Sequence, residues 1–296
     1  MSSLLENLFE FKRPDSVGVK LYLKLFELFS VLYTLIYAWD WGFYILRISD
    51  VVLPLGLANY IDVEIFFGNS LPLIIAGLMT IMSTAAFFTR RFKWLYLLVF
   101  FLLHIQYVTR FSLGEIPHSS NLIGFSMLGL GLAFCFIKNK WNALSFAYGF
   151  LVFFVGLSYT SASISKLVAS GIFWVDGNHL WLWIAEKSTD VLSAEGIFTL
   201  SWVQEMALQS RFIATVILIV GLLTEMFAFL FWWKKLRPLV TLLLIGMHIG
   251  IYYSMNIWFM SYLIELSIIG FPWYKLFNYM DERYRWEGKK VLLKYL

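Results

Sequence analysis

The sequence is poor in the residue types on which soluble and disulfide-linked proteins depend. It has one cysteine, Cys135, in 296 residues, so no intrachain disulfide and no cysteine-based metal site can form. Charged residues make up 14% of the chain, whereas soluble domains usually carry about 25%. No two of the four histidines lie three or four residues apart, the spacing of metal ligands on a helix. These shortages argue strongly against a soluble protein, and we expect no bound metal.

Several catalytic and transport motifs are also missing. The sequence has no glycine-rich phosphate-binding loop, no nucleophile elbow and no His-Glu-x-x-His pair. An ATP-driven pump or a conventional hydrolase is therefore disfavoured. We find no internal repeat with the paired broken helices that many transporters show. The net charge of +4 does not indicate nucleic acid, because the distribution of basic residues described below explains it better.

Hydrophobic residues dominate what is present. They make up 60% of the sequence, aromatic residues make up 20%, and the mean hydropathy is +0.74. Because a bilayer core needs about 20 apolar residues per helix, we expect an all-α polytopic membrane protein with about eight spans. The first span should be retained, since the N-terminal segment lacks a small-residue cleavage site. The predicted spans are 21–47, 70–89, 94–110, 121–138, 144–166, 211–233, 237–254 and 257–275.

The basic residues follow this count of spans. With the N-terminus in the cytoplasm, most of the 23 Lys and Arg fall on the inner side, as the positive-inside rule requires. We therefore expect an integral protein of the bacterial inner membrane with both termini cytoplasmic. The inner residues are Lys12, Arg13, Lys20, Lys24, Arg90, Arg91, Lys93, Lys138, Lys140, Lys234, Lys235, Arg237, Lys275, Arg283, Arg285, Lys289, Lys290 and Lys294.

The organisation along the chain favours a single transmembrane domain, residues 1–274, followed by a charged cytoplasmic tail, residues 275–296. The connection 167–210 is the longest non-spanning stretch and lies on the outer side. Its segments Trp181–Lys187 and Gly196–Leu208 are amphipathic and rich in Trp and Phe, which is typical of short helices at the membrane interface.

Ionisable side chains inside or beside the apolar segments are candidate functional residues. Such a group costs several kcal/mol in hydrocarbon unless it is paired or faces a polar cavity. Seven of them suggest a polar cavity within a helical bundle: Glu27, Asp40, His104, Lys166, Glu225, His248 and Glu265.

The end of the fifth predicted span carries the first candidate constellation. Tyr159, Ser163 and Lys166 lie at i, i+4 and i+7, so they share one face of a helix. A partly desolvated lysine can act as a general base in its neutral form. Alternatively, Lys166 lies at the outer end of its span and extends to the lipid headgroups.

The later spans and the outer connections supply further candidates. Asp176 and His179 form either an acid–base pair or solvated and capping groups of the outer loop. Buried carboxyl groups at Glu225 and Glu265 are neutral or pair with Lys166 or a histidine, and either arrangement serves packing or function. His248 and Tyr252 lie one turn apart on a shared face, and Ser261 and Tyr262 lie one turn before Glu265.

Short motifs in the second half resemble a known membrane family. They are Tyr159…Lys166-Leu167, then Trp174…Gly177, then Glu225 ahead of a basic loop, His248 and the aromatic turn Ile257–Tyr262. This order resembles the HTTM (horizontally transferred transmembrane) family, the membrane domain shared with vitamin K-dependent gamma-carboxylases. The resemblance covers most of the chain and is strongest across 155–271, and it implies that residues 1–274 form an HTTM-like domain.

The resemblance implies a lyase or oxidoreductase activity of the carboxylase and quinol-epoxidase type. In the carboxylases, a lysine of this motif deprotonates vitamin K hydroquinone on the lumenal side, and the strong base formed with oxygen then removes a glutamate γ-proton. Lys166 matches that lysine, His248 matches a histidine of the penultimate conserved span, and His118 lies where the family places a histidine. The residues implied as catalytic are Lys166, His248 and His118. Those implied to bind a reduced quinone are Tyr159, Trp174, Glu225, Tyr252 and Tyr262.

One departure from the family keeps a second interpretation open. Ser165-Lys166 stands where the carboxylases carry two lysines. Small bacterial members also resemble the membrane component that matures a sporulation-delaying peptide toxin. The alternatives to an enzyme are a non-enzymatic membrane scaffold or a maturation partner of a peptide or protein complex, and a quinone-binding redox subunit. We expect the bilayer and a protein or peptide on the extracytoplasmic side as partners, and no nucleic acid.

Overall fold

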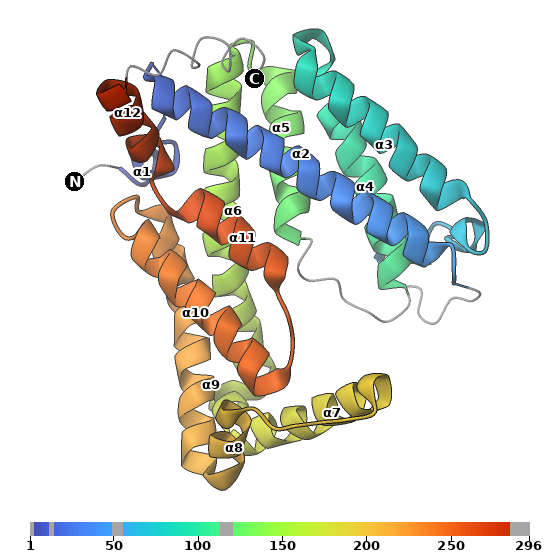
Figure 1. Cartoon of the computed structure of the whole chain (residues 1–296), viewed down its shortest axis with the longest axis vertical. Coiled ribbons are helices and arrows are strands. Elements are labelled where there is room, and N and C mark those ends of the chain that lie inside the picture. Colours follow the sequence, from blue (N-terminus) through green and yellow to red (C-terminus); the bar gives the residue numbers. More distant parts are fainter. Residues whose placement is uncertain (1–2, 12–14, 49–55, 113–120, 285–296) are drawn as a thin grey trace. The chain divides into compact units, whose positions relative to one another are not determined.

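The computed structural model describes residues 3–11, 15–48, 56–112 and 121–284, and these residues form helices without a strand (Figure 1). The predicted all-α class is therefore confirmed. The long helices are α2 (Val17–Ile45), α3 (Leu71–Phe88), α4 (Leu95–Phe111), α5 (Asn121–Phe136), α6 (Lys140–Ser170), α7 (Gly177–Glu195), α9 (Arg211–Met226) and α10 (Arg237–Met255). Shorter helices are α1 (Leu4–Leu8), η1 (Gly56–Asn59), η2 (Glu64–Phe66), η3 (Arg90–Phe92), η5 (Gly171–Val175), α8 (Trp202–Gln209), η6 (Phe227–Trp232), α11 (Met260–Gly270) and α12 (Trp273–Tyr284).

Five helical segments are long and apolar enough to cross a membrane, which supports an integral membrane protein. They are α2, α3, α6 continued by η5, α9 continued by η6, and α10. The other three predicted spans contain the apolar helices α4, α5 and α11, of 17, 16 and 11 residues. Each falls short of the roughly 20 residues that a full crossing requires, so the count of eight spans is not confirmed.

The chain divides into two compact units. Unit 1 consists of Met1–Leu8 and Val152–Phe271, and unit 2 of Phe9–Leu151 and Pro272–Leu296. The division falls within α6, so this helix contributes its first part to unit 2 and its second part to unit 1.

In unit 2, α2 packs against α3, α4, α5 and α12. The buried face of α2 carries large apolar residues such as Leu23, Phe26 and Trp41. Helices α4 and α5 approach closely at Gly131, because a Cβ atom there would lie 2.8 Å from the backbone of Leu97. Small residues at such crossings are typical of helix packing in membranes.

In unit 1, α9 packs against α7, α8 and α10, and α7 crosses the end of this group (Figure 1). Leu180 and Ile184 of α7 form a buried cluster with Ala214 and Leu218 of α9, and tryptophans surround it. Gly177 permits this contact, because a Cβ atom there would lie 2.4 Å from the Arg211 carbonyl oxygen.

The connection 167–210 contains helices, as predicted, but their boundaries differ from the predicted ones. Helix α7 has 19 residues and extends well beyond Trp181–Lys187. The segment Gly196–Leu208 is not one helix, because Gly196 ends α7 in the left-handed conformation (φ 73°). Helix α8 starts only at Trp202, where Ser201 and Gln204 form a capping box.

The described part of the C-terminal tail is also ordered. Residues 273–284 form α12, which packs against α2 in unit 2. Asn278 accepts a hydrogen bond of 2.8 Å from the backbone N–H of Gly18, and Tyr274 contacts the ring of Phe11. The region after 274 therefore begins as a docked helix.

We expect Gly131→Ala to lower the free energy of unfolding by about 1–3 kcal/mol, because the new methyl group would press on the α4 backbone. Gly124→Ala on the same helix is the matched control, since a Cβ atom there meets nothing within 4 Å. It should be neutral or stabilising by up to about 1 kcal/mol, through helix propensity. Thermal unfolding in detergent measures both, and equal midpoints for the two variants would contradict the α4–α5 packing.

Candidate functional site

The second part of α6 carries the residues around which a polar site in unit 1 is built. Tyr159, Ser163 and Lys166 follow one another along one face, as the spacing predicted. Tyr159 and Ser163 are buried, while the side chain of Lys166 is 30% exposed. The face therefore runs from the interior of the unit to its surface.

Lys166 forms an ion pair with Glu225 of α9. The ammonium also lies 5.0 Å from the centre of the Trp174 ring, a cation–π contact. The Glu225 side chain is 10% exposed, so the pair is largely shielded from solvent. The structure therefore brings together three of the predicted site residues, Lys166, Glu225 and Trp174.

A change of helix type fixes the position of Glu225. Helix α9 ends at Met226 and continues as the 3₁₀ helix η6. The Thr160 hydroxyl lies 3.4 Å from the Met226 carbonyl and 3.5 Å from that of Glu225, and it accepts a 3.0 Å hydrogen bond from the N–H of Phe229. Such 3₁₀ stretches within longer helices often mark functional positions. Thr160 thus satisfies backbone groups that the change of helix type would leave unbonded.

Deeper in unit 1, Tyr159 and His248 share a hydrogen bond of 2.6 Å between the phenol oxygen and Nε2. Tyr262 of α11 stacks on the His248 ring at 5.3 Å and lies 6.1 Å from the Tyr159 ring. Phe259 lies 5.0 Å from His248 on another side. Three predicted site residues therefore form one contact group, which is lined by aromatic rings.

Four buried polar atoms beside this group have no hydrogen-bond partner in the described part of the chain. They are both carboxyl oxygens of Glu265, the Ser163 hydroxyl and Nδ1 of His248. Glu265 is fully buried. A buried polar group without a partner costs about 1–3 kcal/mol, so a site that keeps four of them has unused capacity to bind polar atoms.

The remaining candidate residues that the structure describes do not belong to this contact group. Tyr252 packs edge-on against Trp258 at 4.7 Å, and His118 lies outside the described residues. Asp176 forms two hydrogen bonds with Arg211, of 2.7 and 3.0 Å, and caps α7. His179 Nδ1 lies 3.3 Å from the carbonyl oxygen of Trp174. Asp176 and His179 thus have separate partners, which favours the capping interpretation over an acid–base pair.

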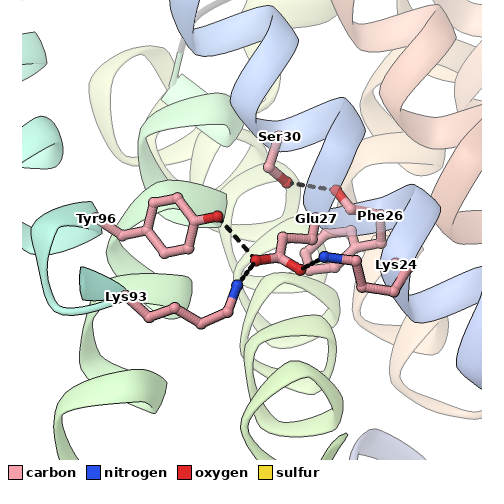
Figure 2. Close-up of polar contacts among 6 residues, drawn as sticks. All are labelled: Lys24, Phe26, Glu27, Ser30, Lys93 and Tyr96. Atoms are coloured by element: carbon pink, nitrogen blue, oxygen red, sulfur yellow. Dashed lines mark hydrogen bonds and ion pairs between the residues drawn. The ribbon is translucent and has the colours of Figure 1, made fainter. Parts of the chain in front are cut away.

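Unit 2 contains a second buried charge cluster, shown in Figure 2. Glu27 accepts hydrogen bonds from Lys24 (2.6 Å), from Lys93 and from the Tyr96 hydroxyl (2.8 Å). These four side chains are buried. The ammonium of Lys24 also lies 4.0 Å from the centre of the Phe87 ring. From the sequence, Glu27 was a candidate residue, whereas Lys24 and Lys93 were counted only among the basic residues of the inner side. The i, i+3 spacing of Lys24 and Glu27 could have predicted their ion pair.

The seven ionisable residues are divided between the two units. Glu27, Asp40 and His104 belong to unit 2, where Asp40 is exposed and lies 3.6 Å from Arg110. His104 stacks between the rings of Phe100 and Tyr107 at 6.1 and 6.0 Å. Unit 1 contains the other four, Lys166, Glu225, His248 and Glu265. It is therefore the unit in which we look for a functional site.

Comparison with protein families, with curated proteins and with solved structures finds no match. Within the described residues, no group of three or more His, Cys, Asp or Glu side chains is arranged to hold a metal ion. The function must therefore be argued from the chemistry of unit 1.

We expect Glu27→Gln to lower the free energy of unfolding by about 3–5 kcal/mol, because it leaves two buried ammonium groups without their carboxylate. Asp190→Asn is the control, since it breaks the exposed ion pair with Lys187 (2.8 Å), which is worth at most about 1 kcal/mol. Chemical unfolding in detergent measures the difference. A loss for Glu27→Gln no larger than that of the control would show that the cluster is not held by charge.

The Asp176–Arg211 pair predicts an acid-dependent contribution to stability. The hydrogen bonds from Arg211, aided by the Asn178 N–H, lower the pKa of the Asp176 carboxyl group. Its contribution is complete above the ordinary carboxyl pKa and disappears as the pH falls through the lowered folded-state pKa. Asp176→Asn keeps the helix cap but removes the charge. The difference in melting temperature between the wild type and this variant should therefore shrink between about pH 5 and pH 2, and a constant difference would refute the assignment.

Proposed function

We propose that this chain is an integral membrane enzyme that removes a proton from a lipophilic quinol at the extracytoplasmic face. The observation that carries the proposal is the Lys166–Glu225 pair, which lies on the same face of α6 as the buried Tyr159–His248 hydrogen bond. The resemblance to the HTTM family and to the membrane domain of vitamin K-dependent gamma-carboxylases supports the same chemistry.

Glu225 gives Lys166 a way to act as a base. In a shielded site, an ion pair and the corresponding pair of neutral groups are closer in energy than in water, because the charged forms lose their hydration. The lysine proton can then pass to the Glu225 carboxylate, and the free amine accepts a proton from a substrate hydroxyl group.

The residues present fit the ring of a quinol. Trp174, Phe259 and Tyr262 supply aromatic surfaces, and the unpartnered atoms of Glu265, Ser163 and His248 supply hydrogen-bonding capacity. When bound, a reduced quinone of the vitamin K hydroquinone type would supply the oxygen-dependent chemistry. The protein groups then hold and orient the ring and take up the proton, with His248 as hydrogen-bonding or acid partner.

The proposed topology places this chemistry on the outer side. We propose eight crossings, in which α4, α5 and α11, the last extended by the non-helical residues 257–259, complete the five long segments. Both termini then lie in the cytoplasm of a bacterial cell. Lys166 then lies at the extracytoplasmic end of α6, and α7 and α8 lie along the membrane interface. A polypeptide substrate, including one that is carboxylated on glutamate, would be presented there by a partner protein.

A non-enzymatic scaffold or maturation partner is the second candidate. It is favoured by the observation that Lys166 pairs with Glu225 and Tyr159 with His248, as expected if polar residues only join the helices. The buried carboxyl group of Glu265 argues against it, since a carboxyl group kept only for packing would pair its two oxygens. We therefore favour the enzyme.

We expect the chain in lipid nanodiscs to convert a reduced naphthoquinone with an isoprenoid tail to its epoxide in the presence of oxygen. Lys166→Ala should lower the rate by on the order of a hundredfold or more, the contribution of a positioned base. Lys187→Ala is the matched control and should keep the wild-type rate, because Lys187 is about as exposed as Lys166 but pairs with Asp190 outside the site. Product formation by chromatography is the measurement.

The result separates the two candidates. A quinol-consuming wild type that loses activity only with Lys166→Ala supports the enzyme. An inactive wild type, or a Lys166→Ala variant as active as the control, would overturn the enzyme and favour the scaffold.

A further inference from the structure

Glu265 is the one buried carboxyl group among the described residues whose two oxygens both lack a hydrogen-bond partner. An ionised carboxylate in such a place would cost far more than a neutral acid, because nothing in the described residues replaces its hydration. The protonated form is therefore the form that the site holds at rest. The proton of Glu265 has no assigned acceptor within the described part of unit 1.

The position of Glu265 on α11 brings it to the Tyr159–His248 group. Glu265 lies three residues after Tyr262, so the two side chains share a face of the helix. Tyr262 stacks on His248, and Tyr159 lies within electrostatic range of Glu265. The neighbouring helices present Tyr159 and Lys166 from α6, His248 from α10 and Glu225 from α9.

Helix α11 also has a form typical of polar sites in membranes. It has 11 residues and follows Asn256, which is left-handed (φ 53°), and the non-helical stretch 257–259. At about 1.5 Å per residue it spans roughly half of the bilayer core. Non-helical backbone at membrane depth is tolerated where it is buried in protein or lines a water-filled cavity. Buried water commonly bonds to polar atoms that lack protein partners, such as those of Glu265, Ser163 and Nδ1 of His248.

We propose that Glu265 is the buried end of a proton-exchange chain that runs through buried water and the Tyr159–His248 hydrogen bond to the partly exposed Lys166–Glu225 pair. In each exchange, Glu265 gives its proton to Nδ1 of His248, Nε2 releases one to the Tyr159 oxygen, and Tyr159 passes its own proton through water to the Glu225 carboxylate. A proton that returns by the same path restores the neutral acid at Glu265. Only protons move, so no oxidant or second reactant is needed. This inference deepens the proposed function. It rests on that function only for the identity of the substrate whose proton reaches the Lys166–Glu225 pair.

The test is infrared spectroscopy of the whole chain in nanodiscs, without any quinol. At neutral pH we expect a carboxylic acid C=O band that Glu265→Gln removes and that Glu205→Gln, at an exposed position on α8, leaves unchanged. Absence of such a band would overturn the proposal, because Glu265 would then be ionised.

Exchange into D2O tests the connection to the surface. Tyr159→Phe should slow the deuterium shift of this band on the order of a hundredfold, the lower limit of what a positioned acid–base group contributes to proton transfer. Tyr253→Phe, at an exposed position on α10, is the control and should exchange at the wild-type rate. Equal exchange rates for Tyr159→Phe and the wild type would overturn the chain. Failure of the quinol assay alone would leave both infrared results unchanged, so the two proposals fail separately.

Discussion

The unfavourable free energy of a charge in apolar surroundings is the constraint on which this structure depends. Removing one partner of a buried ion pair is strongly destabilising, because the other charge stays without compensation. In unit 2 the constraint is met by geometry, since one carboxylate, Glu27, bonds to two lysines and a tyrosine that come from two regions of the chain. In unit 1 it is met only in part, because Glu265 is buried without a bonded neighbour among the described residues.

The same constraint governs the backbone where helices end or change type. Polar backbone groups in an apolar environment need partners from elsewhere, and short polar side chains supply them here. Thr160 bonds to the backbone at the transition from α9 to η6, and Ser201 and Gln204 donate to the carbonyls of Tyr253 and Ser254 near the end of α10. Each interruption is thereby stabilised, and the first of them sets the position of Glu225.

The sequence predicted those features that depend on local spacing. Apolar length predicted the all-α class, and the 3.6-residue period predicted the shared face of Tyr159, Ser163 and Lys166. The partnership of Glu27 with Lys93 joins residues 66 positions apart, and no local pattern encodes such a pair. Helix ends were predicted poorly where turn chemistry decides them: Gly196, where a helical segment was expected to begin, ends α7 instead, and Pro272, inside the predicted last span, precedes α12.

The contrast between the two clusters explains why unit 1 is the better place to look for chemistry. The carboxylate of Glu27 is bonded on both oxygens, and any reaction that changed its charge would destabilise the fold, which suits a structural role. Around His248, a proton can be moved without breaking a bonded network, because Nδ1 and the Glu265 carboxyl group have no partner among the described residues. A folded chain that tolerates this incomplete bonding keeps polar atoms available for a ligand, for water or for a proton. That availability, rather than the number of ionisable residues, distinguishes a site that can react from one that holds helices together.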